Sequence, residues 1–313
     1  MRILISGGTG NLGQHFARHL ISSCEHQVRL LVHRRAVADD LKSPRLELGY
    51  GDLAQADSLV GACEACDCIV HLAGVLFAPH PERFLPITNI EYVRNLMQAA
   101  GHANVSKFIL ISFPHVEGET TPERPASSRL DRSPSVIHFR TRLEAERLVL
   151  QSARPQMRAA VVRAGVVYGP GVKLTEGARW LLRHRMMAIW RKPTWLHLIA
   201  LPDLLHGLQV AAEKPEVSGI YNLCDDEPML LETFLERFAD HIGAPGPWHL
   251  PAWCFGFAGV VCENFANAFR TRAPITRDII AAAMMSSVSN NSRRSELLPK
   301  LEYPSFRQGI SLL

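Results

Sequence analysis

The chain has 313 residues, 47% of them hydrophobic and 20% charged, with a formal net charge of +4 at pH 7. This composition provides enough apolar material for a packed core and excludes a disordered chain. Its Lys and Arg residues form no binding stripe, so we expect no nucleic-acid partner. An apolar segment begins directly after Met1 and Arg2, and the weakly charged stretch 250–262 is shorter than the roughly 20 residues of a membrane span. We therefore expect a cytoplasmic protein without a transmembrane segment.

The seven cysteines are odd in number, which predicts reduced thiols in a cytoplasmic protein. Cys63, Cys66 and Cys68 form a C-x-x-C-x-C cluster. This cluster lacks a second ligand pair and falls where a helix should give way to a strand. We interpret it as small buried residues and expect no metal, with metal or redox chemistry as the alternative.

Short apolar runs alternate with helical patterns in the first half of the chain. Strands are expected at 3–6, 28–32, 46–48, 68–72, 108–111 and 159–163, and helices at 92–103 and 140–152. The last of these helices should carry Glu144 and Glu146 on exposed faces. Strands joined by crossover helices predict a parallel sheet with both faces covered. The segment 117–134, rich in Pro, Ser, Thr and charge, is expected to be a surface loop.

A glycine-rich turn follows the first expected strand and opens the first helix, with the spacing G-x-x-G-x-x-G. Glycines permit a tight turn and a close approach of the backbone to a pyrophosphate, which the N–H groups of the helix N-terminus then bind. The alternative is a turn without a ligand. The residues that we expect to bind the cofactor here are Gly7, Thr9, Gly10, Asn11, Leu12 and Gly13.

Two arginines, Arg34 and Arg35, follow the second expected strand, and no acidic residue occurs before Asp39. An NAD enzyme usually places a carboxylate there for the ribose 2′-hydroxyl, whereas an NADP enzyme places Arg there for the 2′-phosphate. The planar guanidinium suits phosphate. We therefore predict NADP(H) as the cofactor, with two solvated surface arginines as the alternative.

These features predict an α/β, doubly wound parallel-sheet Rossmann fold. After Tyr168-Gly169-Pro170-Gly171 the alternation weakens, and helices mix with isolated strands such as 219–223. We predict an NADP(H)-binding Rossmann domain over residues 1–170. Residues 171–313 are expected to form a smaller, mixed α/β substrate cap with segments that return to the Rossmann core.

Together these residues resemble the extended and atypical short-chain dehydrogenase/reductases, which include nucleotide-sugar epimerases and 3β-hydroxysteroid dehydrogenases. The resemblance covers most of the chain and implies further cofactor contacts. Asp52 and Leu53 would contact adenine, and the His71-Leu72-Ala73-Gly74 turn would cover the diphosphate and ribose through Leu72, Ala73 and Gly74. Asn89 matches an Asn before the fifth strand, and Val166 belongs to a loop beside the nicotinamide that runs from Arg163 to Gly171.

The catalytic residues depart from the pattern of this family, which uses Tyr and Lys in Y-x-x-x-K with an upstream Ser or Thr. The Leu-Glu-Ala-Glu sequence at 143–146 places His138 at the Tyr position and Arg142 at the Lys position. Counting back from Gly118 places Phe113 at the Ser position, and a shift of one residue would restore Ser112 to that role. We take His138, Arg142 and Ser112 as the catalytic candidates, with Arg142 also binding the cofactor.

This replacement changes the chemistry that the site can perform. His138 can exchange a proton, and a neighbouring cation should lower its pKa. Arg142 can bond ribose hydroxyls but cannot relay a proton. Phe113 orients nothing by a hydrogen bond. The family mechanism therefore does not carry over unchanged, and a bound cofactor without the standard reaction is the alternative.

All five tryptophans follow residue 179, together with several Phe and Met residues. Because the resembling family lines its substrate pocket with this segment, we expect a small apolar ligand. The segment 251–269 has Glu263 as its one charged residue and also suits a peripheral membrane contact or a partner, including a second copy in a homodimer. Interleaved arginines and Lys192 suit a nucleotide diphosphate or anionic lipid instead.

We therefore predict an NADP(H)-dependent oxidoreductase or isomerase of a bulky lipid-, terpenoid- or sterol-like alcohol or ketone. One alternative is a redox-silent NADP(H)-binding module that acts as a sensor, assembly factor or ligand carrier. The other is a nucleotide-sugar epimerase or dehydratase.

Overall fold

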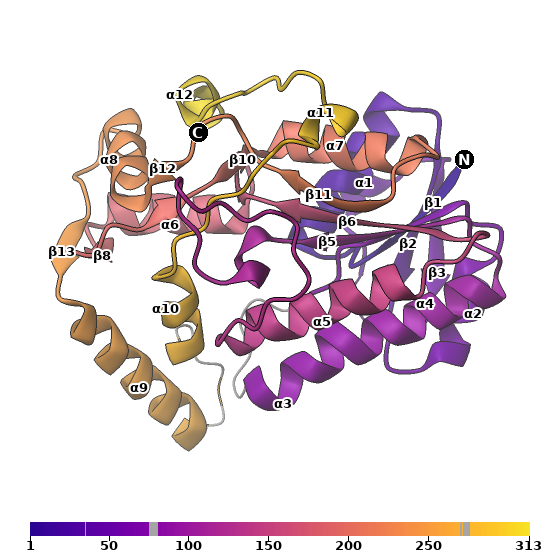
Figure 1. The fold of residues 1–313 in the computed structure, drawn as a ribbon, viewed down its shortest axis with the longest axis horizontal. Coiled ribbons are helices and arrows are strands. Elements are labelled where there is room, and N and C mark those ends of the chain that lie inside the picture. Colours follow the sequence, from indigo (N-terminus) through magenta and orange to yellow (C-terminus); the bar gives the residue numbers. More distant parts are fainter. Residues whose placement is uncertain (35, 75–80, 270, 272–275) are drawn as a thin grey trace.

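A seven-stranded parallel sheet forms the centre of the molecule, with strand order β11-β6-β5-β4-β1-β2-β3 (Figure 1). The computed structural model describes residues 1–34, 36–74, 81–269, 271 and 276–313. Helices cover both faces of the sheet, which confirms the expected doubly wound α/β fold. The strands of the sheet are β1 (Arg2–Ser6), β2 (Gln27–Val32), β3 (Leu46–Tyr50), β4 (Cys68–His71), β5 (Lys107–Ser112), β6 (Arg158–Ala164) and β11 (Gly219–Leu223).

The sheet separates two apolar cores. Figure 1 shows α1 (Asn11–Ser23), α7 (Leu201–Glu213) and α11 (Arg294–Leu297) on one face. The other face carries α2 (Ala56–Cys63), α4 (Tyr92–His102) and α5 (Ile137–Gln151). Strand residues alternate between the two cores, so Ile3 and Ile5 join the first and Leu4 joins the second. A short helix α3 (Pro81–Leu85) and a π-helical turn (Pro86–Glu91) lead into α4.

The C-terminal half both returns to the sheet and builds a separate layer beside it. Strand β11 pairs with β6 at the sheet edge, and α7 packs against α1. The division into residues 1–170 and 171–313 stays a prediction. The elements beside the sheet are β7 (Val166–Tyr168), α6 (Lys173–Arg183), β8 (Ala188–Trp190), β9 (Trp195–Leu196), β10 (Leu198–Ala200), β12 (Met229–Leu230), α8 (Leu231–His241), β13 (Trp248–Leu250), α9 (Ala252–Phe269), α10 (Arg277–Ala283) and α12 (Phe306–Gly309).

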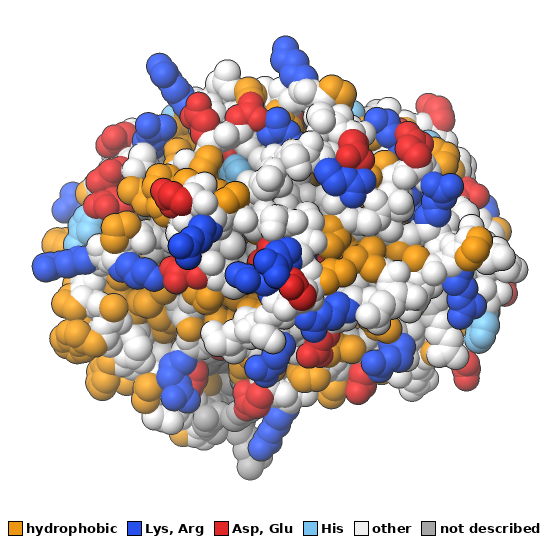
Figure 2. Space-filling view, viewed as in Figure 1, with side chains coloured by type: hydrophobic (Ala, Val, Ile, Leu, Met, Phe, Trp, Pro, Cys, Tyr) orange, Lys and Arg blue, Asp and Glu red, His pale blue; other side chains and the backbone are white. Residues whose placement is uncertain are grey.

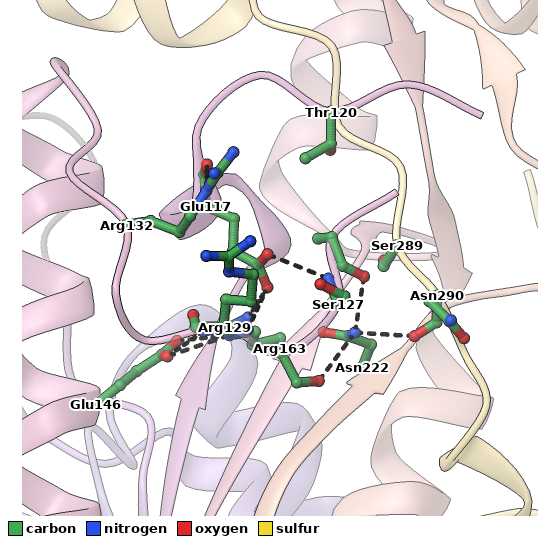
Figure 3. A network of polar contacts seen from close by, with 12 residues as sticks. Glu117, Thr120, Ser127, Arg129, Arg132, Glu146, Arg163, Asn222, Ser289 and Asn290 are labelled. Carbon is green, nitrogen blue, oxygen red and sulfur yellow. Dashed lines mark hydrogen bonds and ion pairs between the residues drawn. The ribbon is translucent and has the colours of Figure 1, made fainter. Parts of the chain in front are cut away.

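The expected exposure of Glu146 is wrong, because this carboxylate lies in a buried ion cluster with Arg163 and Glu117 (Figure 3). The guanidinium of Arg163 donates to Glu146 at 2.7 Å and to Glu117 on the opposite side. Glu117 also accepts the backbone N–H groups of Ser127 and Arg129, at 3.1 and 2.9 Å. The cluster therefore ties β6 to α5 and folds the 117–134 loop back onto both.

The apolar segment 250–262 that the sequence analysis singled out lies largely in α9, at one end of the molecule (Figure 1). Within the described residues, no helix combines the length and apolar character that crossing a membrane requires.

Replacing Glu146 should destabilise the fold, because it leaves one side of the buried Arg163 guanidinium without its counter-charge. Breaking a buried pair in this way typically costs about 3–5 kcal/mol. We expect Glu146→Gln to lower the free energy of unfolding by that order, measured by urea denaturation. Glu144→Gln, two positions earlier on a half-exposed face of the same helix, is the matched control and should change it little. Equal effects of the two substitutions would contradict the role given to the cluster.

Candidate active site

The glycine turn packs so closely against its own chain that side chains are excluded at several of its positions. Gly7 has φ of +77°, and a Cβ added there would lie 2.6 Å from the backbone nitrogen of Ala73. A Cβ at Gly13 would lie 2.2 Å from the carbonyl oxygen of Gly7. The Gly10 N–H donates to the same oxygen at 2.8 Å, which closes the turn directly before α1. No side chain is therefore tolerated at Gly7 or Gly13. The N–H groups in the first turn of α1 are the ones that a helix leaves available to an anion.

Asn11 joins this turn to the loop after β7. Its side-chain amide donates to the Gly171 carbonyl at 2.8 Å, and its side-chain oxygen accepts the Lys173 N–H at 3.1 Å. The side chain of Asn11 is thus occupied by the protein itself. A contact of Asn11 with a cofactor would have to come from its backbone N–H at the start of α1.

The adenine side of the expected site lies at the ends of β2 and β3. The ring of His33 approaches the carboxylate of Asp52 at 3.4 Å, and the Asp52 carboxylate accepts the Ala54 N–H at 2.9 Å. Arg34 is exposed directly after β2, where it is accessible to a 2′-phosphate. Arg35 lies outside the described residues. Leu53 accepts the Asn95 side-chain amide through its carbonyl at 2.9 Å, which orders the turn after β3.

Helix α5 brings the catalytic candidates to the carboxyl end of the sheet. It begins at Ile137, three residues earlier than expected, so that His138 lies in its first turn. The His138 ring stacks on Phe113, with 5.2 Å between ring centroids and 14° between the planes. One turn later, the Arg142 guanidinium reaches the His71–Gly74 turn, since a Cβ added at Gly74 would lie 2.9 Å from it. The structure therefore places Phe113 against His138 and Arg142 against the His71–Gly74 turn, and the catalytic roles of these residues stay a prediction.

Several polar atoms in this region are buried without a hydrogen-bond partner among the described residues. Both ring nitrogens of His138 belong to this group, as do Nε and Nη1 of Arg142, Oγ of Ser112 and Oδ1 of Asn89. The amide nitrogen of Asn89 is bonded, because it donates to the Thr141 hydroxyl at 2.9 Å. Buried polar groups are ordinarily satisfied, so this concentration indicates a place where a polar ligand completes the network. Donors of this kind beside a glycine cradle fit the ribose and phosphate groups of a dinucleotide.

Burial and the Arg142 charge lower the pKa of His138 to about 4, so its ring is neutral at pH 7. The sequence analysis expected this direction from the cation alone, but burial is the larger cause. Burial also lowers the pKa of Arg142, to about 10, which leaves it charged at neutral pH. A charged guanidinium therefore stands one helical turn from an uncharged imidazole, and the pair offers both a fixed cation and a neutral hydrogen-bonding ring.

The sequence analysis gave His71 no role of its own. His71 ends β4, and its Nδ1 bonds the Ser6 hydroxyl at the end of β1 over 2.6 Å. Burial and the Arg142 charge lower its pKa to about 3. Its Nε2 has no partner among the residues described. In the sequence, His71 ends an apolar strand next to a glycine-containing turn, and this position could have identified it as a residue of the site.

The lining of a substrate pocket by the cap aromatics stays a prediction. Trp180, Trp248 and Trp253 are exposed, as are Phe257, Phe265 and Phe269. Trp190 is buried and donates through its indole nitrogen to the Thr194 hydroxyl at 2.7 Å, so it is part of the core. Apolar composition predicted that these side chains avoid water, but it did not predict which of them have protein neighbours.

The cysteine cluster lies at the predicted junction, between the end of α2 and the start of β4. Cys63, Cys66 and Cys68 are all buried. Burial raises the pKa of Cys63 and of Cys68 to about 12, which disfavours the thiolate that metal binding requires. The interpretation as buried structural residues fits this arrangement.

Comparisons with known proteins relate both the fold and the site to one family. A ketoreductase of 4-hydroxy-2-methyl-3-oxo-4-farnesyl-3,4-dihydroquinoline-1-oxide from Stigmatella aurantiaca is 25% identical over 75% of this chain and 71% of its own. The human decarboxylating sterol-4-alpha-carboxylate 3-dehydrogenase is 23% identical over 80% of this chain and 70% of its own. The solved structure of human epimerase family protein SDR39U1 with NADPH has a TM-score of 0.73 at 20% identity, and the match covers 99% of this chain and 98% of that one.

The family model of the NAD dependent epimerase/dehydratase family matches residues 3–211, which include the glycine turn, β4, β5 and all of α5. Proteins named as reductases and dehydrogenases are among the relatives. The resemblance to extended short-chain dehydrogenase/reductases is thereby confirmed. This chain belongs to the NAD dependent epimerase/dehydratase family, a family of enzymes that depend on a nicotinamide dinucleotide.

Proposed function

We propose that this protein is an NADP(H)-dependent oxidoreductase of a bulky apolar ketone or alcohol. The observation that carries the proposal is the group of unpartnered buried polar atoms on His138, Arg142, Ser112 and Asn89, beside the glycine cradle. A protein that used this fold only as a scaffold would have little reason to bury a guanidinium with unmet donors. Burying such a group without hydrogen-bond partners is unfavourable. A ligand that supplies these partners therefore gains binding free energy from the hydrogen bonds.

The chain's own residues divide the chemistry between them. A bound nicotinamide dinucleotide supplies or accepts the hydride. The carbonyl oxygen of the substrate then needs a proton during reduction, or loses one during oxidation. His138 is placed to donate that proton in its protonated form, or to orient it through a hydrogen bond of its neutral ring. Arg142 would hold the cofactor ribose, and Ser112 offers a hydroxyl at the end of β5. Burial and the Arg142 charge lower the pKa of His138.

An apolar substrate is favoured by the surroundings of His138. The aromatic rings of Phe113, Phe139 and His115 adjoin one another there, with centroid separations of 5.0–6.3 Å. The relatives named above act, by their names, on a farnesylated quinoline oxide and on a sterol carboxylate. Rings that flank the proton donor provide apolar contact area, whereas sugar hydroxyls would require several hydrogen-bonding side chains.

A redox-silent cofactor-binding module is the second candidate, and Phe113 is the observation that favours it. Its ring covers one face of His138 at the position where the family has a hydroxyl. A protein that binds NADPH tightly but oxidises none of it in the presence of any ketone would have this second function.

NADPH should bind more tightly than NADH, because Arg34 and Arg35 follow β2 and no acidic residue precedes Asp39 in this segment. A hydrogen-bonded charge pair contributes about 1.5–3 kcal/mol, so we expect a preference of roughly 10- to 100-fold. Titration calorimetry with both cofactors measures it. The double variant Arg34→Ala, Arg35→Ala should lose the preference, while Lys42→Ala, a nearby exposed cation, should keep it. Equal affinities in the unmodified protein would refute the assignment of NADP(H).

His138 should be required for turnover in a pH-dependent manner. Its pKa lies near 4, so the protonated form declines as pH rises and the rate of ketone reduction should fall from pH 4 to pH 7. General acid catalysis is worth about 10²–10⁴-fold, so His138→Phe should lose that much in kcat.

A second substitution distinguishes proton transfer from orientation at this position. His138→Gln keeps a hydrogen-bonding side chain but cannot titrate, so it should lose as much as His138→Phe and should flatten the pH profile. Phe113→Ala should affect kcat only through packing. Full activity in His138→Phe would remove this residue from the reaction.

An apolar ligand should stabilise the protein against heat in the presence of NADPH. A ligand at 100 times its Kd adds about 2.7 kcal/mol to the free energy of unfolding. A thermal-shift panel of sterol-like ketones, terpenoid ketones and nucleotide sugars measures the change in Tm. We expect stabilisation by the first two classes. A shift produced by nucleotide sugars alone would instead support an epimerase or dehydratase.

A further inference from the structure

Helix α9 presents a continuous apolar stripe to solvent. Trp253, Phe257, Val261, Phe265 and Phe269 recur at every fourth position, and their exposed fractions are 71%, 64%, 48%, 58% and 65%. Figure 2 shows hydrophobic side chains gathered at the lower left of the molecule, where Figure 1 draws α9. Exposed apolar surface of this extent on one element usually marks an interaction site.

The one charged residue of α9 is turned away from this stripe. Glu263 accepts the Arg277 backbone N–H at 2.7 Å and the Arg277 side chain at 2.8 Å. Gly259 lies against the same neighbour, since a Cβ added there would be 2.9 Å from Ile280 and 3.2 Å from Arg277. The contacts with α10 therefore use the opposite face of α9, and the outward face is left without charge.

A basic segment borders the start of α9. Strand β8 pairs with β13, which leads into the helix, and the Trp248 indole N–H donates to the Arg185 carbonyl at 3.0 Å. Residues 177–192 include several Arg and Lys but no Asp or Glu. Arg179 and Lys192 are paired with carboxylates, whereas exposed Arg183, Arg185 and Arg191 form no ion pair with any described residue. Figure 2 shows Lys and Arg side chains at the left margin, next to the apolar patch.

We propose that α9 and the adjoining basic segment dock on the surface of an anionic lipid bilayer. Trp and Phe side chains suit the boundary between headgroups and acyl chains, because their apolar rings enter it while an indole N–H stays hydrated. Basic residues beside such a helix strengthen binding to anionic lipid. The helix would lie in the plane of the interface, with Trp253 and Phe257 inserted and Arg183, Arg185 and Arg191 at the headgroups.

Charge favours a bilayer over a second copy of the chain as the occupant. A symmetric dimer sets the same patch of both copies against itself. A second copy would then set the uncharged stripe against itself, and its own residues 177–192 would bring no carboxylate to Arg183, Arg185 and Arg191. Anionic headgroups supply the opposite charge to these arginines while the acyl region accepts the stripe.

Vesicle flotation tests the proposal on the full chain and needs neither substrate nor NADPH, so its outcome is independent of the proposed activity. We expect the protein to float with vesicles of phosphatidylcholine and phosphatidylserine, and its tryptophan emission to shift to shorter wavelength. The double variant Phe257→Glu, Phe265→Glu should partition at least about 10-fold less, because it puts two charges on the inserted face. Removing the three arginines as Ala should weaken binding roughly 5-fold for each cation.

Leu48→Glu is the matched control, because Leu48 is also exposed but lies on β3, away from α9. This variant should float like the unmodified protein. Circular dichroism confirms that each variant is folded. Three results would overturn the proposal: no flotation of the unmodified protein, equal flotation of the Phe257 and Phe265 variant, or equal binding to vesicles of phosphatidylcholine alone. The stripe would instead belong to an interface with a second copy under two conditions. The unmodified protein would be a dimer in sedimentation analysis without binding vesicles, and the Phe257 and Phe265 double variant would be a monomer.

Discussion

The position of α5 depends on the buried ion cluster of Arg163, Glu146 and Glu117. A guanidinium without solvent contact is stable only when carboxylates and carbonyls surround it, so β6, α5 and the 117–134 loop must meet at one point. The carbonyl of Arg129 accepts a further N–H of Arg163 at 3.0 Å, which leaves the loop little freedom. Because α5 also carries His138, the cluster sets where the candidate proton donor stands relative to the sheet.

Arg142 on α5 and Arg163 on β6 are two buried arginines with different roles. Both are buried, and both lie near Glu146. The protein itself satisfies Arg163, whereas Nε and Nη1 of Arg142 have no partner among the described residues. Burying a cation without hydrogen-bond acceptors destabilises a fold, unless a bound ligand supplies those acceptors. The unmet donors of Arg142 therefore identify the ligand side of α5, and the saturated Arg163 identifies the structural side.

Local patterns predicted the strands, the glycine turn and α5, because each depends on residues close in sequence. The resemblance to the family, rather than a local pattern, placed His138 and Arg142 at the Tyr and Lys positions and Phe113 at the Ser position. In the structure the rings of His138 and Phe113 are in contact. The patterns failed where the partner is remote. Glu146 looked like a solvated helix residue because its partner Arg163 lies on a later strand. The aromatic residues of α9 are equally apolar in sequence whether they are buried or exposed, and only packing against α10 decides which face remains open.

The exposed stripe and the candidate active site are mechanically connected through α10. The carboxylate of Asp278 on α10 accepts the backbone N–H of Ile137 at the start of α5, and Arg277, the preceding residue, holds Glu263 of α9. An unsatisfied N–H at a helix start is a strong donor, so this contact fixes the N-terminal turn of α5 against α10. His138 lies in that turn. A surface that holds α9 would therefore also hold the N-terminal turn of α5 through α10.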